Sequence, residues 1–213
     1  MTSIINVKMP VFTVEAKLRI SKEAAAANRA RVVKAAARLF REKGVDAIAV
    51  SDLMKAAGLT HGGFYNHFDS KDALAAAAYR EAFDQAVARA ERNGERAQTE
   101  KPGKVLAEYV DRYLSRETLN SPGTSCPMSA LGTDAARHGS LLRGEFAQGV
   151  RRYMDAFTRL VPGKGRRQRK DALTTLSTLI GAVTLARACA GADDTLADEI
   201  LDAVGTSVKG AHR

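Results

Sequence analysis

The sequence predicts an all-α protein of about nine helices. Almost throughout the chain, apolar residues recur three or four positions apart, the spacing that places them on one face of a helix. Glycine and proline fall between these periodic stretches, where helices begin or end. We find no convincing strand. Hydrophobic residues make up 45% of the 213 residues, which supports a substantial core.

Three helices are predicted near the N-terminus. The first spans residues 23–43, and Gly44 follows as a C-terminal stop. The second spans residues 50–57 and is closed by Gly58. A fourth, long and Ala-rich helix is predicted to run from Ser70 to about residue 93, and a polar hinge or linker over residues 94–103 follows it. Residues 1–24, which precede the first helix, are interpreted as a mobile arm.

The third helix, over residues 60–68, is the most informative segment. Thr60 is a good N-cap, and Leu59 and Phe64 flank it in a hydrophobic staple. A helix this short is not stable alone in water, so its apolar side must be anchored on the first two helices. The opposite, polar side is then free to face a partner. This arrangement predicts a helix-turn-helix whose third helix enters the major groove of DNA. A generic helical bundle with a short connector is the alternative.

Composition narrows the classes of function. The formal net charge of +9 suits a polyanionic partner, and the first third of the chain is the more basic per residue. The two cysteines form no CxxC pair and have no nearby histidine at metal spacing, which argues against a zinc site or a disulfide framework. No cofactor is expected. We see no uninterrupted apolar run of the length that a membrane span needs, and we expect an intracellular, cytoplasmic protein.

A set of residues in fixed order carries a family resemblance. These residues are Ala36, Arg38-Leu39-Phe40, Gly44, Asp52-Leu53-Met54, Ala56-Ala57-Gly58, Gly63, Phe64-Tyr65, His67-Phe68, Ser70-Lys71-Asp72 and Leu74. With them, residues 28–74 resemble the N-terminal domain of the TetR family of one-component transcriptional regulators. Residues 125–132 resemble a bacterial subgroup of that family. Ala49 departs from the pattern, because the family usually has a threonine cap there; Ser51 is a partial substitute.

The resemblance implies a division of the chain and a mode of action. Residues 25–75 would form the helix-turn-helix DNA-binding domain, and residues 76–213 an all-helical regulatory domain for ligand binding and dimerisation. It also implies a homodimer that binds a roughly palindromic, double-stranded operator. Two helices, at about 166–190 and 195–209, are the predicted dimer interface. The alternative is that the more apolar of them is only the buried centre of the domain.

Seven residues are predicted to contact DNA: Thr60, His61, Gly62, Tyr65, Asn66, His67 and Lys71. His61 and Asn66 are candidates for hydrogen bonds to base edges. The resemblance assigns Tyr65 to the DNA backbone or a thymine methyl, and Lys71 lies at a helix start, where phosphate is favoured. Gly62 has no side chain and permits close approach. Alternatively, Tyr65 is a half-buried packing residue and His61 is merely solvated.

A ligand pocket is predicted between residues 103 and 190. Its candidate lining residues are Tyr109, Tyr113, Cys126, Met128, Phe146, Tyr153, Met154 and Phe157. The alternative is that these residues belong to the core. Cys126 precedes a predicted helix start at Pro127, a location that lowers a thiol pKa. It is therefore either a sensor of electrophiles or oxidants, or an inert cysteine in the pocket.

These predictions favour a ligand-responsive repressor that a small-molecule or electrophile inducer releases from DNA. An activator and a ligand-independent DNA-binding protein are the alternatives within regulation. A helical enzyme is the alternative of another class, but we see no nucleophile–base pair, metal cluster or phosphate loop that would support it.

Overall fold

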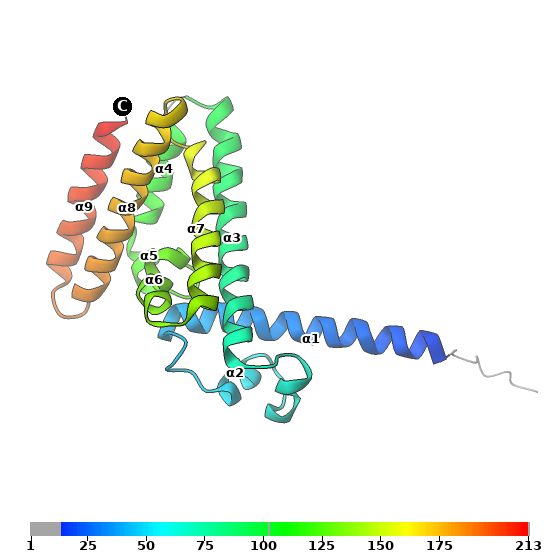
Figure 1. Cartoon of the computed structure of the whole chain (residues 1–213). Coiled ribbons are helices and arrows are strands. Elements are labelled where there is room, and N and C mark those ends of the chain that lie inside the picture. Colours follow the sequence, from blue (N-terminus) through cyan, green and yellow to red (C-terminus); the bar gives the residue numbers. More distant parts are fainter. Residues whose placement is uncertain (1–13, 102, 213) are drawn as a thin grey trace, which may run out of the picture.

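The computed structural model describes residues 14–101 and 103–212, and within them the chain forms nine α-helices and one 3-10 helix (Figure 1). In chain order they are α1 (Val14–Lys43), α2 (Val50–Ala56), η1 (His61–Asn66), α3 (Lys71–Thr99), α4 (Lys104–Tyr113), α5 (Arg116–Asn120), α6 (Pro127–Arg137), α7 (Ser140–Thr158), α8 (Gly165–Cys189) and α9 (Asp194–Ala211). The all-α fold class predicted from the sequence is confirmed.

A small N-terminal head is built from α1, α2, η1 and the first turns of α3. Its core contains Phe40, Leu53, Met54, Phe64 and Phe68, all buried. The predicted ends of the first two helices are confirmed, since α1 stops at Lys43 and α2 at Ala56. The third segment is a 3-10 helix rather than an α-helix, as is common for such short pieces.

The first helix begins earlier than its apolar spacing indicates. Helix α1 starts at Val14, so the part of the predicted mobile arm from residue 14 to residue 24 is helical. The remainder of that arm, residues 1–13, lies outside the described residues. In Figure 1, α1 extends well beyond the body of the molecule. Apolar residues alternate with polar ones over residues 14–20 (Val14, Ala16, Leu18 and Ile20), a spacing typical of a strand rather than a helix, so apolar periodicity does not reveal this extension.

Helix α3 is also longer than predicted. It passes through Gly94 and ends at Thr99, so Gly94 is not a stop. Gly94 is buried, and a Cβ atom there would lie 3.1 Å from the Cβ of Arg159. Gly149 on α7 is tighter, because a Cβ there would lie 2.3 Å from the ring of Phe83 on α3. These glycines let α3 and α7 pack closely side by side (Figure 1).

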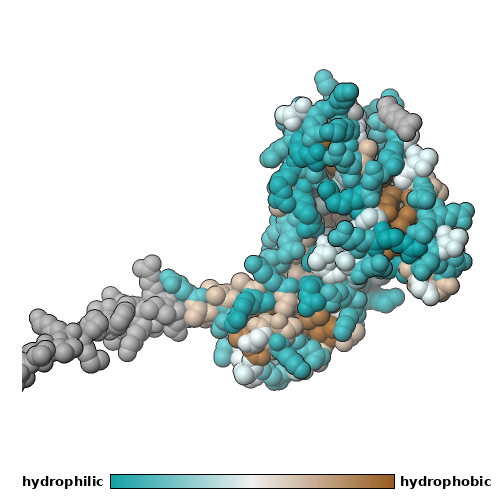
Figure 2. Space-filling view, turned by 180° about the vertical axis from the view of Figure 1, so that it is seen from behind, coloured by the Kyte–Doolittle hydropathy of each residue, from teal (hydrophilic) through white to brown (hydrophobic). Residues whose placement is uncertain are grey.

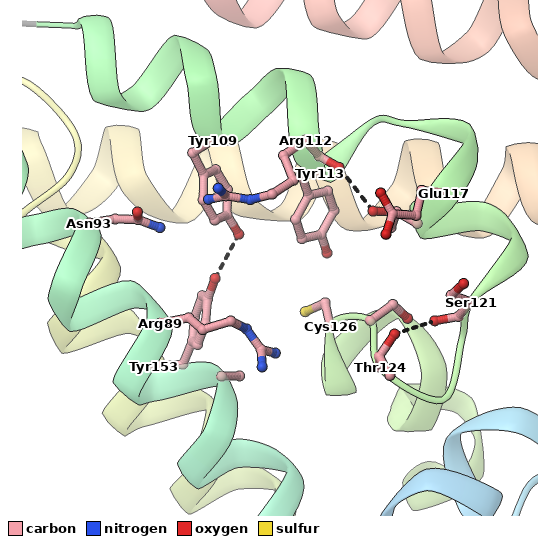
Figure 3. Close-up of a pocket in the computed structure, with 13 residues that line it drawn as sticks. Arg89, Asn93, Tyr109, Arg112, Tyr113, Glu117, Ser121, Thr124, Cys126 and Tyr153 are labelled. Carbon is pink, nitrogen blue, oxygen red and sulfur yellow. Dashed lines mark hydrogen bonds between the residues drawn. The ribbon is translucent and has the colours of Figure 1, made fainter.

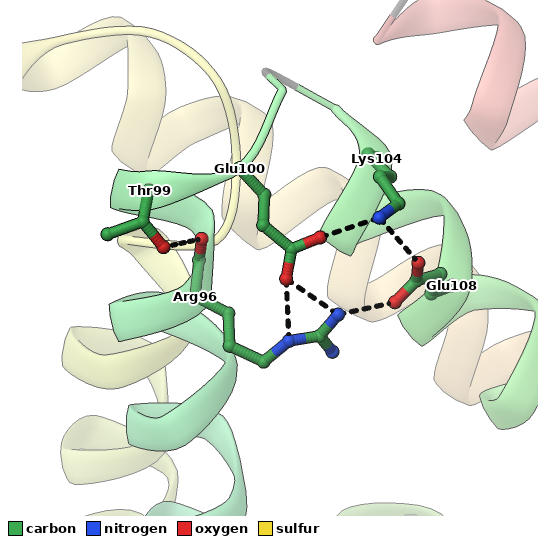
Figure 4. A network of polar contacts seen from close by, with 5 residues as sticks. All are labelled: Arg96, Thr99, Glu100, Lys104 and Glu108. Atoms are coloured by element: carbon green, nitrogen blue, oxygen red, sulfur yellow. Dashed lines mark hydrogen bonds and ion pairs between the residues drawn. The ribbon is translucent and has the colours of Figure 1, made fainter.

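The predicted hinge after α3 is instead a braced junction. Arg96 pairs with Glu100 and with Glu108, both at 2.8 Å, and Lys104 pairs with Glu100 at 2.8 Å (Figure 4). The four side chains join the end of α3 to the start of α4. Isolated surface ion pairs contribute little to stability, but a network whose members share partners restricts the junction more effectively.

The remaining helices form the larger part of the molecule. Its core joins residues of α3, α4, α6, α7, α8 and α9, including Phe83, Tyr109, Phe157 and Leu179. Pro127 is the first residue of α6, as its position after a loop predicts. Helix α5 ends at Asn120, and residues 121–126 connect it to α6 without a helix. Helices α8 and α9 lie side by side at one edge (Figure 1).

The outer face of α8 and α9 is unusually apolar. Leu185 is 60% exposed, Leu173 45% and Leu196 41%. Figure 2 shows a mostly hydrophilic surface with hydrophobic colour on the side where these helices lie and also on the head. By length and composition alone α8 is apolar enough to cross a membrane, contrary to the sequence expectation, although a core helix can pass the same test. Exposed Thr174, Thr178 and Thr184 interrupt its apolar surface.

Candidate DNA interface and ligand cavity

The short helix η1 has two faces of opposite character. Phe64 is 1% exposed and Phe68 is buried, and their ring centroids are 5.7 Å apart within the core of the head. Tyr65 next to Phe64 is 73% exposed, so the interpretation of Tyr65 as a half-buried packing residue is wrong. Leu59 is partly buried and packs against the same core, in agreement with the predicted staple. The apolar side of η1 is thus fixed while its polar side faces solvent.

The seven residues predicted to contact DNA lie within or beside η1. Thr60, His61, Gly62, Tyr65 and Asn66 are exposed, whereas His67 and Lys71 are partly buried. Thr60 occupies the N-cap position, but its side chain makes no capping hydrogen bond, so the predicted capping role is wrong. A Cβ atom at Gly62 would meet nothing within 4 Å, which leaves this part of the surface open to close approach. Their contact with DNA remains a prediction.

The residues around η1 include one helix cap and one positive charge that lie close to its exposed side. Ala49 is the N-cap residue of α2 and offers no side-chain hydrogen bond there. Ser70 caps α3, because its hydroxyl accepts a hydrogen bond of 3.0 Å from the backbone N–H of Ala73. The guanidinium of Arg29 on α1 lies 4.8 Å from the centre of the Phe68 ring. Sequence reasoning missed Arg29, which places a positive charge beside the end of η1.

A cavity of about 250 Å³ lies in the larger part of the molecule (Figure 3). It is lined by Ala86, Arg89, Asn93, Tyr109, Arg112, Tyr113, Glu117, Thr118, Ser121, Thr124, Ser125, Cys126 and Tyr153. These residues come from α3, α4, α5, the loop before α6, and α7. Only a fold that brings these five segments together creates the site.

Half of the predicted lining is present in this cavity. Tyr109, Tyr113, Cys126 and Tyr153 line it. The other four predicted residues do not: Met128, Met154 and Phe157 are buried in the core, and Phe146 is partly buried and packs against it. These four residues therefore belong to the core, which was the alternative to a pocket lining, and apolar residues at helical spacing are typical of a core. The polar lining residues on α3 and α5 were missed, because nothing in their spacing sets them apart from a solvated face.

Three tyrosines line the cavity. The hydroxyls of Tyr109 and Tyr153 hydrogen-bond to each other at 2.6 Å. Burial raises the pKa of Tyr109, Tyr113 and Tyr153, so all three hydroxyls keep their protons at neutral pH. The buried Tyr113 hydroxyl faces the side of Cys126 and has no hydrogen-bond partner among the described residues (Figure 3). The Tyr113 hydroxyl is therefore an uncharged hydrogen-bond donor in the cavity without an acceptor.

Cys126 does not have the lowered pKa that its position before α6 predicts. It is buried, and burial raises the pKa of its thiol. The Tyr113 hydroxyl, the backbone N–H groups of Met128 and Ser129, and the charge of Arg89 act in the opposite direction but do not overcome burial. Cys126 is therefore chiefly a thiol in the wall of the cavity. Within the described residues, no group of histidine, cysteine and acidic side chains could hold a metal ion.

Polar contacts connect the head to α6 and to the loop before it, which lines the cavity. Arg41 of α1 is buried and donates hydrogen bonds to the carbonyls of Ala37 and Ser125, at 2.8 and 3.1 Å. Burial lowers the pKa of Arg41 to about 10. At the other end of α6, Asp134 accepts hydrogen bonds from the backbone N–H of Val45 at 3.3 Å and from the Tyr79 hydroxyl at 2.8 Å. Helix α6 and the loop before it thus contact both the cavity and the head.

Comparison with known proteins agrees with the geometry of the head. Residues 32–78 match the model of the bacterial regulatory proteins of the tetR family. Residues 32–78 of this chain are therefore a TetR-family domain. Its relatives include the HTH-type transcriptional repressor Rv1474c of Mycobacterium tuberculosis, which is 37% identical over 76 residues, and the repressor KstR2 of Rhodococcus jostii, which is 44% identical over 46 residues.

These sequence matches are confined to part of each protein. They cover 36% of this chain and 41% of the Mycobacterium protein, and 22% of both this chain and the Rhodococcus protein. The likeness in fold is wider. The reduced form of NemR from Escherichia coli has a TM-score of 0.70 at 17% identity, covering 86% of this chain and 96% of that one. A TetR-family regulator from Cytophaga hutchinsonii has a TM-score of 0.69 at 18% identity, covering 88% and 96%. The larger part of the chain therefore shares the fold of those proteins.

Proposed function

We propose that this TetR-family protein is a dimeric transcriptional repressor that binds a palindromic operator and is released by a small molecule. The observation that carries the proposal is the pairing of two sites in one chain. One is the exposed polar side of η1, fixed by a buried apolar side. The other is a cavity whose wall is bonded to the head through Arg41. The first suits a major groove, and the second suits an inducer.

Release would follow from a shift in population between two arrangements of the dimer. In one arrangement the spacing of the two heads matches the operator half-sites, and in the other it does not. An inducer that binds the second arrangement more tightly lowers operator affinity, and the size of the effect is set by the difference between its affinities for the two arrangements. The contacts of Arg41 with Ser125, and of Asp134 with Val45, are the direct bonds through which a change in the cavity reaches the head. Cys126 contributes to this proposal as a wall of the cavity.

Operator binding is tested with the Tyr65→Ala variant. Its side chain is exposed, so the variant should fold normally while its affinity for a selected operator falls about tenfold or more at fixed salt. Ser51→Ala, on an exposed position of α2, is a matched control that should bind more nearly as wild type. Wild-type affinity of Tyr65→Ala in a titration by fluorescence anisotropy would contradict the assignment.

The dimer interface is tested on the apolar face of α8. Leu185→Glu places a charge where a partner helix would pack, and we expect a monomer by light scattering. Leu141→Glu is the control, because Leu141 is 51% exposed on α7, outside this face. A dimer that survives Leu185→Glu but not Leu141→Glu would move the interface elsewhere.

The electrophile hypothesis and the other regulatory functions give different outcomes. If Cys126→Ser still releases operator on exposure to an electrophile, Cys126 is not the sensor; its raised pKa argues for that outcome. A ligand-independent DNA-binding protein would keep its operator whatever small molecule fills the cavity. An activator would bind the same operator and raise transcription from it in a reporter assay.

A further inference from the structure

The cavity is surrounded by positive charge that has no acidic partner. Arg89 and Arg112 line it; both are exposed to solvent, and no ion pair or side-chain hydrogen bond of either is found among the described residues. Figure 3 shows the Arg112 side chain beside Tyr109 and the Arg89 side chain directed toward the side of Cys126. Glu117 is the one acidic lining residue, and it is exposed.

Two further arginines support the wall of the cavity through neutral acceptors. Arg41 donates to two backbone carbonyls and to the side-chain amide oxygen of Gln85. Arg187 of α8 donates to the carbonyls of Thr118 and Leu119, at 3.0 and 3.3 Å, and to the Ser125 hydroxyl. Both side chains are partly or fully desolvated, and burial lowers the pKa of each. Their charges therefore add to a positive potential around the cavity.

The Tyr113 hydroxyl adds a second, independent sign of a missing ligand. It is buried and has no partner within the described residues, and a buried donor without a partner destabilises the protein. The Cys126 thiol and the Ser129 hydroxyl lie near enough to affect the pKa of Tyr113, but neither forms a hydrogen bond with it, so an acceptor oxygen that enters the cavity would satisfy the protonated Tyr113 hydroxyl.

We propose that the cavity binds a small organic carboxylate, with Arg89 and Arg112 attracting the carboxylate, the ring faces of Tyr109 and Tyr153 packing on an apolar body, and Tyr113 donating to a ligand oxygen. This inference rests on the proposed function, whose inducer it assigns to a chemical class. Carboxylate is the planar anion that a guanidinium binds with two parallel hydrogen bonds. A cationic ligand would meet Arg89 and Arg112 in the lining and the charges of Arg41 and Arg187 behind it, and a neutral ligand would form no ion pair with any of them. The cavity volume of about 250 Å³ limits the ligand to a small molecule.

The test compares carboxylates with their neutral amides on the full-length protein. The probes are benzoate with benzamide, cinnamate with cinnamamide, and octanoate with octanamide, at constant ionic strength and with binding measured by calorimetry. We expect at least one carboxylate to bind about tenfold or more tightly than its amide. The absence of any such preference across the three pairs, including the absence of all binding, overturns the proposal. Inorganic phosphate that binds as tightly as the best carboxylate overturns the requirement for an apolar body.

Variants locate the effect in the cavity. Arg89→Gln combined with Arg112→Gln should remove the preference for carboxylate, whereas Arg92→Gln, an exposed control on the same helix outside the cavity, should keep it. Tyr113→Phe should weaken carboxylate binding and yet raise the Tm of the ligand-free protein, because it removes a buried group without a partner. A preference unchanged in the double arginine variant contradicts the proposed site.

Operator release, measured separately, distinguishes this inference from the function on which it rests. If benzylamine or an amide releases the operator and the carboxylates do not, the regulator stands and the carboxylate inference is overturned. If a carboxylate binds through Arg89 and Arg112 but leaves operator affinity unchanged, the ligand class stands and ligand-controlled release is overturned.

Discussion

The head and the cavity are built in opposite ways. The proposed DNA-contacting residues belong to one short stretch of chain, residues 60–71, and a few buried aromatic rings fix their orientation. The cavity is assembled from five segments that are spread over residues 86–153. A site in one stretch leaves a local pattern in the sequence. A site made of distant segments exists only through the packing of helices, so substitutions far from it can alter it.

In the head, neighbouring residues of η1 should therefore have different roles: one stabilises the fold and the next contacts DNA. Phe64→Ala removes a ring that is 1% exposed from the small core of the head, and we expect a loss of about 3–5 kcal/mol in the free energy of unfolding. Tyr65→Ala, one residue further on, should change the free energy of unfolding by less than about 0.5 kcal/mol. Denaturant titration of both variants measures the contrast. Equal losses would mean that Tyr65 also supports the fold and that the two faces of η1 are not distinct.

In the larger part, a change outside the cavity should disturb it through packing. Gly149→Ala would place a methyl group 2.3 Å from the Phe83 ring and force α3 and α7 apart, at a cost of about 1–3 kcal/mol. Helix α3 carries Arg89 and Asn93, so ligand binding should weaken as well. Gly144→Ala is the control on α7, since nothing lies within 4 Å of its Cβ position. A stable Gly149→Ala variant with normal ligand affinity would show that α3 and α7 can move apart at little cost in free energy and without changing the cavity.

The same contrast explains what the sequence could predict. The boundaries of the head helices and the anchoring of Phe64 and Phe68 followed from stops, caps and spacing, all of which are local. Gly94 was read as a helix stop because, without a partner helix in view, a glycine cannot be recognised as a point of close packing. Arg89 and Arg112 were missed for a related reason: an arginine on a polar helix face is indistinguishable from a solvated one until another helix closes a cavity beside it. Cys126 was assigned a low pKa from its helix position alone, and burial by distant residues reverses that direction.

The contact of Arg41 with the cavity loop should matter for communication between the two regions more than for either site alone. Arg41→Met keeps an apolar stem in the same place and removes the hydrogen bonds to Ser125 and Gln85. We expect the ratio of operator affinities without and with inducer to fall by about fivefold, equivalent to about 1 kcal/mol of coupling. Lys34→Met, at an exposed position of the same helix, is the control. Loss of operator binding in Arg41→Met without inducer would instead make Arg41 a structural part of the head.

The second junction between the regions should depend weakly on pH. On α6, His138 Nδ1 lies 2.8 Å from the carbonyl oxygen of Asp134, and its Nε2 lies 3.4 Å from the Asp46 carboxylate in the head. The backbone hydrogen bond to Asp134, aided by the Asp134 and Asp46 charges, raises the pKa of His138 above its ordinary value of 6.5. The Tyr79 hydroxyl is the other titratable group at this junction, and it stays protonated because burial raises its pKa. The pH dependence therefore belongs to His138.

Because the folded-state pKa of His138 is raised, its stabilising contribution is complete below pH 6.5 and is lost as the pH rises through the folded-state value. Between about pH 6 and 8 the Tm of the wild type should fall relative to that of His138→Gln, which cannot titrate. His61→Gln, on the exposed side of η1, should keep the wild-type pH profile. This effect should be the smallest of the four, since one partner, Asp46, is 89% exposed and its charge is screened by solvent. A constant difference in Tm between wild type and His138→Gln across this range would mean that the protonated ring does not stabilise the contact between the head and α6.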